Sequence, residues 1–381
     1  MTTPPYTAEL HLALKAVHNA SLLTKSVLRT LKNHVSAETK ADDSPVTIAD
    51  FAAQALLIAA IHARFPDDAF IGEESADALR SNETLGDRVW ELVLRAKEEA
   101  DAGVTGTGDM QHVRDEYAEA LTFPASKENM FDLIDLGGKG EITGSGRVWV
   151  MDPVDGTMTF MQGQQYAVCL CLLVDGVQQV GVIGCPNLAF DVHGPLGQTR
   201  LHEDQVDEAG FGVVLSAVKG QGTHIRSVHR AELGAPRRVD LSELPTTSLE
   251  NLNFVEATIG KTSLSQTEHK AVATSLGASS NWPGTILWSQ QLKYVALTLG
   301  ATDVMVRIPK TKDRFTYIWD HAGGHILFQE AGGHIRDFDG GEIDFGQGRK
   351  IKGERNYGMI ATMPSLSEHV DRAVHEVLGR R

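Results

Sequence analysis

The stretch RVWVMDPVDGT, residues 147–157, joins an apolar run to a turn that carries two carboxylates. RVWVM predicts a short buried strand, and DPVDGT predicts the turn after it. Because Pro153 fixes one φ angle and Gly156 permits a tight bend, Asp152 and Asp155 can both point at one spot. Like charges this close are unfavourable unless a cation lies between them, and hard oxygen ligands suit Mg²⁺. An ordinary Asx-type turn without a metal explains the stretch equally well.

The sequence directly after this turn predicts a β-hairpin. The apolar run QYAVCLCLLV at 165–174 is typical of a strand, on which Cys169 and Cys171 share one face and are expected in the core. Asp175-Gly176 is a strong hairpin signal between this strand and the run VQQVGVIG at 177–184. The sequence therefore predicts an antiparallel pair of strands next to the two carboxylates.

Helices dominate the sequence before the turn. Apolar residues spaced by three, four and seven predict helices at 7–31, 46–64 and 88–100. The segment DDAFIGEESA at 67–76 predicts a short strand that runs into an acidic turn. Residues 101–146 are rich in Gly and Asp and have weak periodicity, so we expect loops there with one short helix near 112–121.

A second domain is expected to follow the hairpin. At roughly 100–200 residues per domain, 381 residues suggest two domains. The polar, turn-rich stretch 186–210 holds the boundary, which gives an N-terminal domain, 1–205, and a C-terminal domain, 206–381. Elements expected in the latter are strands near 211–218, 253–259, 303–308 and 357–362, and helices near 266–276, 289–299, 319–331 and after Pro364.

The charge balance restricts the partners of this chain. Thirty-five basic and fifty acidic residues give a net charge of −15, which repels nucleic-acid backbones and anionic membranes. No apolar run is long enough for a transmembrane helix, and the N-terminus has no signal-peptide core. With three cysteines, a reducing compartment and a cytoplasmic location are expected. A small anionic substrate stays compatible, because a bound divalent metal inverts the local field.

Three further acids stand in segments that could reach the same site. Asp50 lies in the first turns of a predicted helix, Glu73 ends a predicted strand, and Asp320 opens a predicted helix. A carboxylate near a helix N-terminus stays ionised and can bind a metal. Taken singly, each acid is better explained as a surface charge or a helix cap.

The order of these acidic segments resembles a known family. SPVTIAD at 44–50, FIGEES at 70–75, WVMDPVDGT at 149–157 and IWDHAGGHILFQEAGG at 318–333 resemble the inositol monophosphatase superfamily of metal-dependent, lithium-sensitive phosphatases. Within it, the segments QYAVCLCLLVDG, GVIGCPNL, SQQLKY, IWDHAGG and DFGQGR look most like the 3′(2′),5′-bisphosphate nucleotidases. The resemblance extends from about residue 8 to about residue 365, apart from 101–140.

The resemblance implies both a fold and a metal centre. The fold is a mixed α/β sandwich with α/β/α/β/α layers, of the inositol monophosphatase and sugar phosphatase type, with two or three Mg²⁺ ions at the domain junction. The implied metal ligands are the Val154 carbonyl and the carboxylates of Glu73, Asp152, Asp155 and Asp320. Asp50 and Thr157 would orient and deprotonate the attacking water, and Gly156 and Thr157 would offer backbone N–H groups to the phosphate.

Only some of the substrate-binding positions of the nucleotidases are retained in this chain. Implied substrate-binding positions are Ser263, Ser265, Ser289, Gln290, Lys293 and Arg307. Lys293 and Arg307 would lie near the 5′-phosphate or the base, although they could equally be a surface lysine and a strand-edge arginine. This chain departs from the nucleotidases at Met158 and Gln162, which replace two cations, at Ser265, where a histidine is missing, at Trp288, which replaces an acid, and at Tyr317, which replaces a lysine.

The expected function is that of a monomeric, Mg²⁺-dependent phosphomonoesterase. The expected substrate is 3′-phosphoadenosine 5′-phosphate, hydrolysed to AMP and phosphate, with the sulfated analogue as a candidate second substrate. One alternative is a phosphatase of inositol phosphates or of another small phosphorylated metabolite. A second alternative is a non-catalytic sensor of nucleotide or metal, against which the full set of acids argues.

Overall fold

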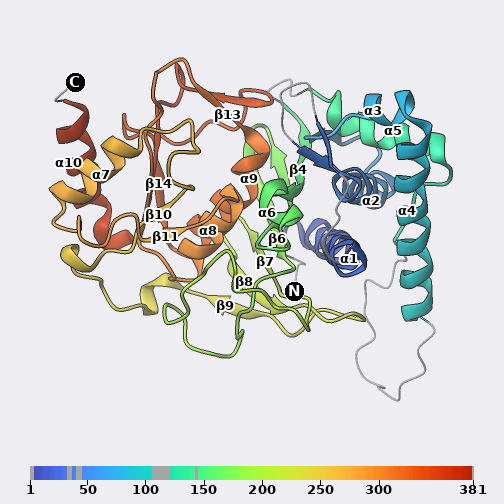
Figure 1. Ribbon diagram of the computed structural model, residues 1–381, viewed down its shortest axis with the longest axis horizontal. Helices are drawn as coiled ribbons and strands as arrows, with labels where there is room; N and C mark the ends of the chain where they lie inside the picture. Colours follow the sequence, from blue (N-terminus) through green and yellow to red (C-terminus); the bar gives the residue numbers. More distant parts are fainter. Residues whose placement is uncertain (1–3, 32–36, 40–44, 105–120, 142–144, 380–381) are drawn as a thin grey trace.

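The computed structural model describes residues 4–31, 37–39, 45–104, 121–141 and 145–379, and it has a layered α/β architecture (Figure 1). From one side to the other, the layers are the helices α7 and α10, a three-stranded sheet, the helices α8 and α9, a seven-stranded sheet, and the helices α1 and α2. The expected α/β/α/β/α sandwich is therefore confirmed.

The seven-stranded sheet carries the segment that predicted the fold. Its order is β3-β4-β5-β6-β7-β8-β9, with β3 and β4 parallel and all other neighbours antiparallel. The strands are β3 Ala69–Gly72, β4 Arg147–Asp155, β5 Ala167–Val174, β6 Val177–Cys185, β7 Val213–Val218, β8 Gly222–Ser227 and β9 Arg237–Val239. Strands from both sides of the expected boundary at 205/206 join this one sheet, and the boundary itself stays a prediction.

The predicted hairpin between β5 and β6 is confirmed. Val174 pairs with Val177, and the two residues between them, Asp175 and Gly176, have φ angles of 50° and 76°. Positive φ at both central positions is the geometry that the twist of a hairpin favours. Cys169 and Cys171 are buried in the core, as expected from their alternation on β5.

The helices of the first half lie on the outer face of the seven-stranded sheet. They are α1 Thr7–Leu31, α2 Ile48–Arg64, α3 Asp77–Ser81, α4 Glu83–Val104 and α5 Lys127–Gly138, and a small ribbon of β1 Ala37–Thr39 and β2 Pro45–Thr47 precedes α2. Residues 48–61 of α2 are all buried, because this alanine-rich helix is packed between the sheet and α4 and α5. None of the described helices combines the length and the apolar character needed to cross a membrane.

The expectation of loops with one short helix near 112–121 is wrong for residues 127–138, because α5 forms there. Ser126 caps this helix by accepting a hydrogen bond from the Asn129 N–H at 3.1 Å. The buried Met130, Phe131 and Ile134 give it an apolar face that the glycines at 137–138 and the surrounding polar residues obscure in the sequence. The short helix expected near 112–121 falls almost entirely outside the described residues.

The second half forms the smaller sheet and the helices on both of its faces. The sheet has the antiparallel order β12-β16-β14, with β12 Val304–Arg307, β14 His334–Arg336 and β16 Met359–Thr362. The helices are α7 Gln266–Ser275, α8 Gln290–Thr298, α9 Ala322–Glu330 and α10 Ser367–Leu378. Short pairs join β10 Val255–Glu256 to β11 Thr285–Ile286 and β13 Phe315–Tyr317 to β15 Lys350–Lys352. Single turns are α6 Thr157–Met161 and the 3₁₀ helices η1 Leu241–Glu243, η2 Leu249–Asn251, η3 Ile318–Asp320 and η4 Pro364–Leu366.

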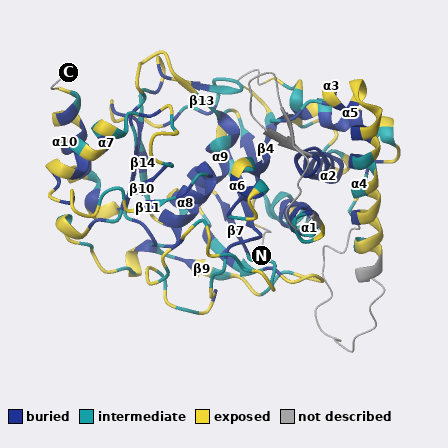
Figure 2. Ribbon diagram, in the orientation of Figure 1, coloured by how far each residue is buried: buried dark blue, intermediate teal, exposed yellow. Residues whose placement is uncertain are grey.

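Two apolar cores lie on the two faces of the large sheet. Along β4, Val148 and Val150 face the core shared with α8 and α9, whereas Trp149 and Met151 face the core shared with α1 and α2. This alternation is the period of two that a strand imposes. Figure 2 shows the result, with buried residues along the sheet and exposed ones on α4 and at the periphery. β4 is therefore fixed on both faces where it approaches the acids.

Candidate active site

Three carboxylates converge where β4 meets η3. Asp152 and Asp155 lie on β4 and Asp320 ends η3, and one oxygen from each acid lies within 4.8 Å of the oxygens from the other two. Asp152 is 2% exposed and Asp155 is 8% exposed. The fold thus brings together acids from two motifs that are far apart in the sequence.

A bulge in β4 aims its two acids at one point. The segment DPVD was expected to be a turn, but it continues the strand to Asp155, so that expectation is wrong. Against β5, Asp152 pairs with Cys169 and Asp155 with Ala167, so β4 uses one residue more than its partner. Residues three apart in a regular strand face opposite sides, and the extra residue of a bulge removes this difference. Pro153 fits here because a bulge does not need its missing N–H.

The acids raise one another's affinity for protons. Burial first, and then the charges of Glu73, Asp155 and Asp320, raise the pKa of Asp152 well above its usual range. The same causes, burial followed by Asp155 and Glu73, raise the pKa of Asp320 to about 8. A divalent cation would remove this penalty, and a set of carboxylate oxygens is the donor set that hard cations prefer. The residues present therefore fit a hard divalent metal.

Asp155 is held by the N-terminus of α8. Its carboxylate accepts hydrogen bonds from the Ser289 hydroxyl and from the backbone N–H groups of Gln290 and Gln291. Ser289 also caps the helix, since its hydroxyl oxygen accepts from the Leu292 N–H at 3.0 Å. Ser289, which the resemblance implied for substrate binding, thus has its hydroxyl committed to Asp155 and to the helix.

Glu73 and Asp50 approach the cluster from the first half of the chain. Parallel pairing of Gly72 with Met151 makes Glu73 and Asp152 the next residues on neighbouring strands. Glu73 is not one of the three acids within 4.8 Å, but its charge acts on Asp152 and Asp320. The Thr157 hydroxyl lies 3.5 Å from Asp50 Oδ1 and 3.2 Å from the Val154 carbonyl oxygen. The structure thus brings the expected Asp50–Thr157 pair within hydrogen-bond reach.

A chain of hydrogen bonds behind Asp320 was not found from the sequence. The Thr316 hydroxyl lies 3.4 Å from Asp320 Oδ2 and 2.9 Å from His321 Nε2. His321 Nδ1 lies 2.8 Å from the hydroxyl of Tyr294 on α8. His321 has no clear role in the sequence, and Thr316 lies in a polar stretch without a pattern. These residues are close in the sequence, and the packing of α8 adds Tyr294 to them.

Two cations lie beside the acids. Lys293 is 5% exposed, which rules out the alternative of a surface lysine, and its Nζ lies 3.5 Å from Gln290 Oε1. Arg307, the last residue of β12, donates to the same Gln290 oxygen and, at 3.4 Å, to the Thr316 hydroxyl. Burial, and then the charge of Arg307, lowers the pKa of Lys293 to about 8. Thr316 thus bridges Arg307 to Asp320.

The two other serines expected to bind substrate, Ser263 and Ser265, lie in different surroundings. Ser263 lines a hollow of about 40 Å³ together with Arg307, Arg314 and Thr316. Ser265 directly precedes α7, and its backbone N–H donates to the Ile308 carbonyl at 2.7 Å. The hollow brings Ser263, but not Ser265, next to Arg307.

The carboxylate of Glu203, from the turn-rich stretch 186–210, lies next to Trp288, one of the positions where this chain differs from the nucleotidases. Trp288 stands where the nucleotidases carry an acid, and its backbone N–H donates to the carboxylate of Glu203. Burial raises the pKa of Glu203 to about 7. At the other departures, Met158 and Gln162 are exposed on and after α6, and Tyr317 stacks on Trp319 with ring centroids 4.5 Å apart. Glu203 could not be found from the sequence because it lies in the expected linker.

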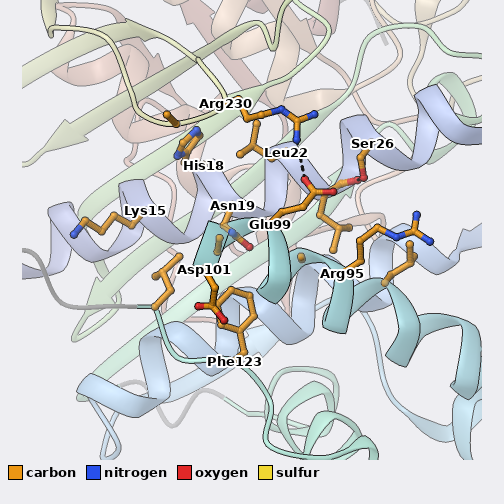
Figure 3. Close-up of a pocket in the computed structure, with 16 residues that line it drawn as sticks. Lys15, His18, Asn19, Leu22, Ser26, Arg95, Glu99, Asp101, Phe123 and Arg230 are labelled. Carbon is orange, nitrogen blue, oxygen red and sulfur yellow. Dashed lines mark hydrogen bonds and ion pairs between the residues drawn. The ribbon is translucent and has the colours of Figure 1, made fainter. Parts of the chain in front are cut away.

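A larger cavity lies elsewhere in the molecule. It has a volume of about 350 Å³ and lies between α1 and α4 (Figure 3). The ion pair between Glu99 and Arg230, 3.2 Å apart, crosses its wall, and Lys15, Arg95 and Phe123 also line it. The acids of the cluster do not line it, so it is separate from the site built on β4 and η3.

The model of the inositol monophosphatase family matches residues 8–92 and 102–371. A 3′(2′),5′-bisphosphate nucleotidase of Emericella nidulans is 37% identical over 375 residues, which are 98% of this chain and 99% of that protein. One of Schizosaccharomyces pombe is 36% identical over 378 residues, 98% of this chain and 97% of that protein. One of Oryza sativa is 33% identical over 384 residues, 98% of this chain and 96% of that protein.

Solved structures share the fold at low sequence identity. The extragenic suppressor protein suhB of Bartonella henselae has a TM-score of 0.57 at 17% identity, over 97% of this chain and 98% of that one. The IMPase of Thermotoga maritima has a TM-score of 0.55 at 18% identity, over 98% of both chains. The resemblance given by the four acidic segments is confirmed. The chain belongs to the inositol monophosphatase family, a metal-dependent family, and relatives that match it over nearly its full length include 3′(2′),5′-bisphosphate nucleotidases.

Proposed function

We propose that this chain removes the 3′-phosphate of 3′-phosphoadenosine 5′-phosphate and releases AMP and phosphate. The observation that carries the proposal is the link between the acid cluster and Arg307 through Thr316, which bonds both Arg307 and Asp320, while Lys293 shares Gln290 with Arg307. A bisphosphorylated substrate needs one site for the phosphate that is cleaved and a second for the phosphate that stays. The names of the relatives from Emericella nidulans and Schizosaccharomyces pombe support the same substrate.

The proposed metal is Mg²⁺, bound as two or three ions. The residues proposed to hold it are the carboxylates of Glu73, Asp152, Asp155 and Asp320 and the carbonyl of Val154. Divalent ions in such a site lower the pKa of water and neutralise charge on the transferred phosphoryl group. The Val154 carbonyl accepts a hydrogen bond from the Thr157 hydroxyl at 3.2 Å, and a carbonyl oxygen has a second lone pair that can bind a cation.

Asp50 and Thr157 are proposed to position and deprotonate the attacking water. The Thr157 hydroxyl can donate its hydrogen to Asp50 or to the Val154 carbonyl, so its oxygen lone pairs are directed away from them. A water donating to this oxygen would be oriented for in-line attack, and its proton would pass through Thr157 to Asp50. The backbone N–H groups of Gly156 and Thr157, at the turn after β4, are the proposed donors to the phosphate.

The second phosphate is proposed to lie against Lys293, Arg307 and Ser263. Lys293 and Arg307 share Gln290 as a hydrogen-bond partner, which fixes the direction of both side chains. Ser289 contributes by holding Asp155, whereas Ser265 stays a predicted contact without further support. A monomeric state and a cytoplasmic location also stay predictions.

Phosphate release from two substrates side by side tests the proposal. The full chain is assayed on 3′-phosphoadenosine 5′-phosphate and on inositol 1-phosphate, with Mg²⁺ and then with EDTA. We expect turnover of the nucleotide that EDTA abolishes, with much weaker turnover of the inositol phosphate. Preference for inositol 1-phosphate would show that the proposed substrate is wrong. Tight nucleotide binding without phosphate release would show that the chain is a sensor and not an enzyme.

A further inference from the structure

Arg349 reaches from the segment before β15 into the first half of the chain. One terminal nitrogen, Nη2, donates to the Gly72 carbonyl at 2.7 Å. The other, Nη1, donates to the Gly137 carbonyl at 3.0 Å and to the Gly140 carbonyl at 3.3 Å. Gly137 lies in the last turn of α5 and Gly140 two residues after the helix, where the negative end of the helix dipole favours a cation. The guanidinium therefore holds β3 and α5 together.

The same residue also holds the turn that carries Asp320. The Arg349 carbonyl accepts a hydrogen bond from the Ile318 N–H at 3.0 Å. Its guanidinium carbon lies 4.8 Å from the centroid of the Trp319 ring, a cation–π contact. Ile318 and Trp319 are the two residues of η3 that precede Asp320. Arg349 thus contacts the segment that presents Glu73 and the segment that presents Asp320.

Contacts on both sides fix the backbone around Glu73. The Gly72 carbonyl that Arg349 binds belongs to the peptide bond leading into Glu73, so this hydrogen bond fixes that peptide plane. On the other side, the Gln54 amide accepts from the Glu74 N–H at 2.9 Å and donates to the Glu74 carbonyl at 2.6 Å. A Cβ on Gly72 would lie 2.5 Å from Gln54 Oε1, so a larger residue there would displace the amide that binds Glu74. Glu73 is held by α2 on one side and by Arg349 on the other.

We propose that Arg349 is a positioning residue that sets the distance between Glu73 and Asp320 and thereby the affinity of the site for divalent cations. The inference rests on the proposed function only for the identity of the metal site, not for the substrate. A planar guanidinium has several donors in fixed directions, so it can bind three carbonyls and stack on Trp319 at once. A lysine at this position keeps the charge but cannot make these contacts together. Residues that orient metal ligands from behind typically change metal affinity by about 10- to 100-fold when they are replaced.

Arg29 offers a matched control for the loss of these contacts. Its Nη2 donates to the carbonyls of Glu208, Ala209 and Gly210, at 3.2, 2.9 and 2.6 Å, and its guanidinium carbon lies 4.5 Å from the centroid of the Phe211 ring. Arg29→Lys therefore removes the same kinds of contact, three carbonyls and one ring, between α1 and the segment at 208–211. None of the acids of the cluster belongs to these segments.

The test is a Mn²⁺ titration of the metal-stripped full chain, followed by the electron paramagnetic resonance signal of free Mn²⁺. For Arg349→Lys and Arg349→Gln, we expect the Mn²⁺ dissociation constant to rise by about 10- to 100-fold. Arg29→Lys should bind Mn²⁺ as the unsubstituted chain does. Thermal unfolding in EDTA serves as the second readout, and we expect Arg349→Lys and Arg29→Lys to lower the unfolding temperature by similar amounts.

Three other outcomes would contradict the inference about Arg349. Unchanged Mn²⁺ affinity in a folded Arg349 variant would overturn it, and so would an equal loss of affinity in Arg29→Lys. If neither Arg349 variant folds, Arg349 is required for the fold rather than for positioning, and the inference fails. The titration uses no substrate, so a chain that binds Mn²⁺ but does not hydrolyse 3′-phosphoadenosine 5′-phosphate would overturn the proposed function and leave this inference standing.

Discussion

Asp152 and Asp155 are neighbours with different local support. Asp155 accepts three hydrogen bonds from the start of α8, whereas Asp152 Oδ1 accepts from the Val154 N–H at 3.2 Å. Charge on Asp152 is therefore stabilised less by the protein and depends more on a bound cation. An uncharged amide at position 152 should relieve repulsion in the metal-free protein and at the same time remove a proposed metal ligand.

We therefore expect Asp152→Asn to have opposite effects on stability and activity. Phosphate release at saturating Mg²⁺ should fall by at least about 100-fold, because the carboxylate organises charge in the transition state. In EDTA, the variant should unfold at a higher temperature than the unsubstituted chain. Calorimetry in EDTA and a phosphate-release assay measure the two effects. Near-normal turnover would show that the acid cluster is not the metal site.

Lys293 gives the site a pH dependence of known sign. Burial and Arg307 lower its pKa to about 8, while the charges of Glu256, Asp155 and Glu203 oppose this shift. The cationic form, which is proposed to bind the anionic substrate, is lost above pH 8. We expect KM for 3′-phosphoadenosine 5′-phosphate to rise progressively between pH 8 and 10. Lys293→Met should have a high KM that no longer changes across this range, and a persisting rise would assign the titration to another group.

Whereas deprotonation of Lys293 should weaken substrate binding, it should make the folded protein more stable. Its folded-state pKa lies below the unfolded value of 10.5, so the unfolded chain binds more protons between about pH 8 and 10.5. The contribution of Lys293 to stability therefore rises with pH in this window, and its buried charge costs stability below it. Lys293→Met should unfold at a higher temperature than the unsubstituted chain at pH 7, as measured by calorimetry without substrate. Equal unfolding temperatures would mean that the lysine charge is solvated in the folded protein.

Among the elements, the turn between β4 and α6 links a backbone conformation, that of Gly156, to the position of Asp155. Gly156 has a φ angle of 97°, and a Cβ there would lie 2.9 Å from Thr159 Oγ1 and 3.1 Å from the Ser289 Cβ. Ser289 holds Asp155, so a displaced Ser289 would move that acid. Gly163, two residues after α6, also has a positive φ angle, 73°, but a Cβ there would meet nothing within 4 Å. Comparing alanine substitutions at the two glycines therefore separates the effect of backbone strain, common to both, from the effect of crowding, which only Gly156 has.

We expect both Gly156→Ala and Gly163→Ala to lower stability, and we expect them to differ in activity. Each should lose roughly 1–2 kcal/mol of unfolding free energy, the cost of a left-handed conformation for a residue with a Cβ, and Gly156→Ala should lose more because its Cβ is also crowded. Gly156→Ala should also lose most of its phosphate-release activity, while Gly163→Ala keeps it. Urea unfolding and the phosphate-release assay provide the comparison. Full activity in Gly156→Ala would show that the Ser289–Asp155 contact tolerates displacement.

Elements with a strong local signal could be predicted from the sequence, and elements shaped by tertiary contacts could not. The β5–β6 hairpin followed from Asp175-Gly176, whose conformations are local. The strand character of DPVD did not, because the bulge that accommodates Pro153 exists only through pairing with β5. The helix α5 was missed because its buried face, around Phe131, is short and adjoins glycines that usually indicate loops. The acids of the site were found from their motifs, whereas Glu203, Thr316 and Arg349 act through contacts that chain folding alone creates.

At the scale of the whole molecule, two halves of the chain meet at the proposed metal site. Asp152 and Asp155 come from the large sheet, Glu73 directly follows its strand β3, and Asp320 comes from the turn between β13 and α9. Arg349 and the start of α8 connect these parts across the site. The net charge of −15 means that every added cation also reduces general repulsion. A specific effect of Mg²⁺ on stability must therefore be separated from screening.

Mg²⁺ should stabilise the metal-stripped chain more than a monovalent salt does at the same ionic strength. Binding to the folded state alone adds about 2.7 kcal/mol at a concentration 100 times the dissociation constant. NaCl at equal ionic strength only screens exposed charges, so it should raise the unfolding temperature less. Asp320→Asn provides the second control, because it keeps the general charge within one unit but removes one acid of the cluster. If Mg²⁺ and NaCl shift the unfolding temperature equally in both proteins, the cluster binds no divalent ion and its acids share protons instead.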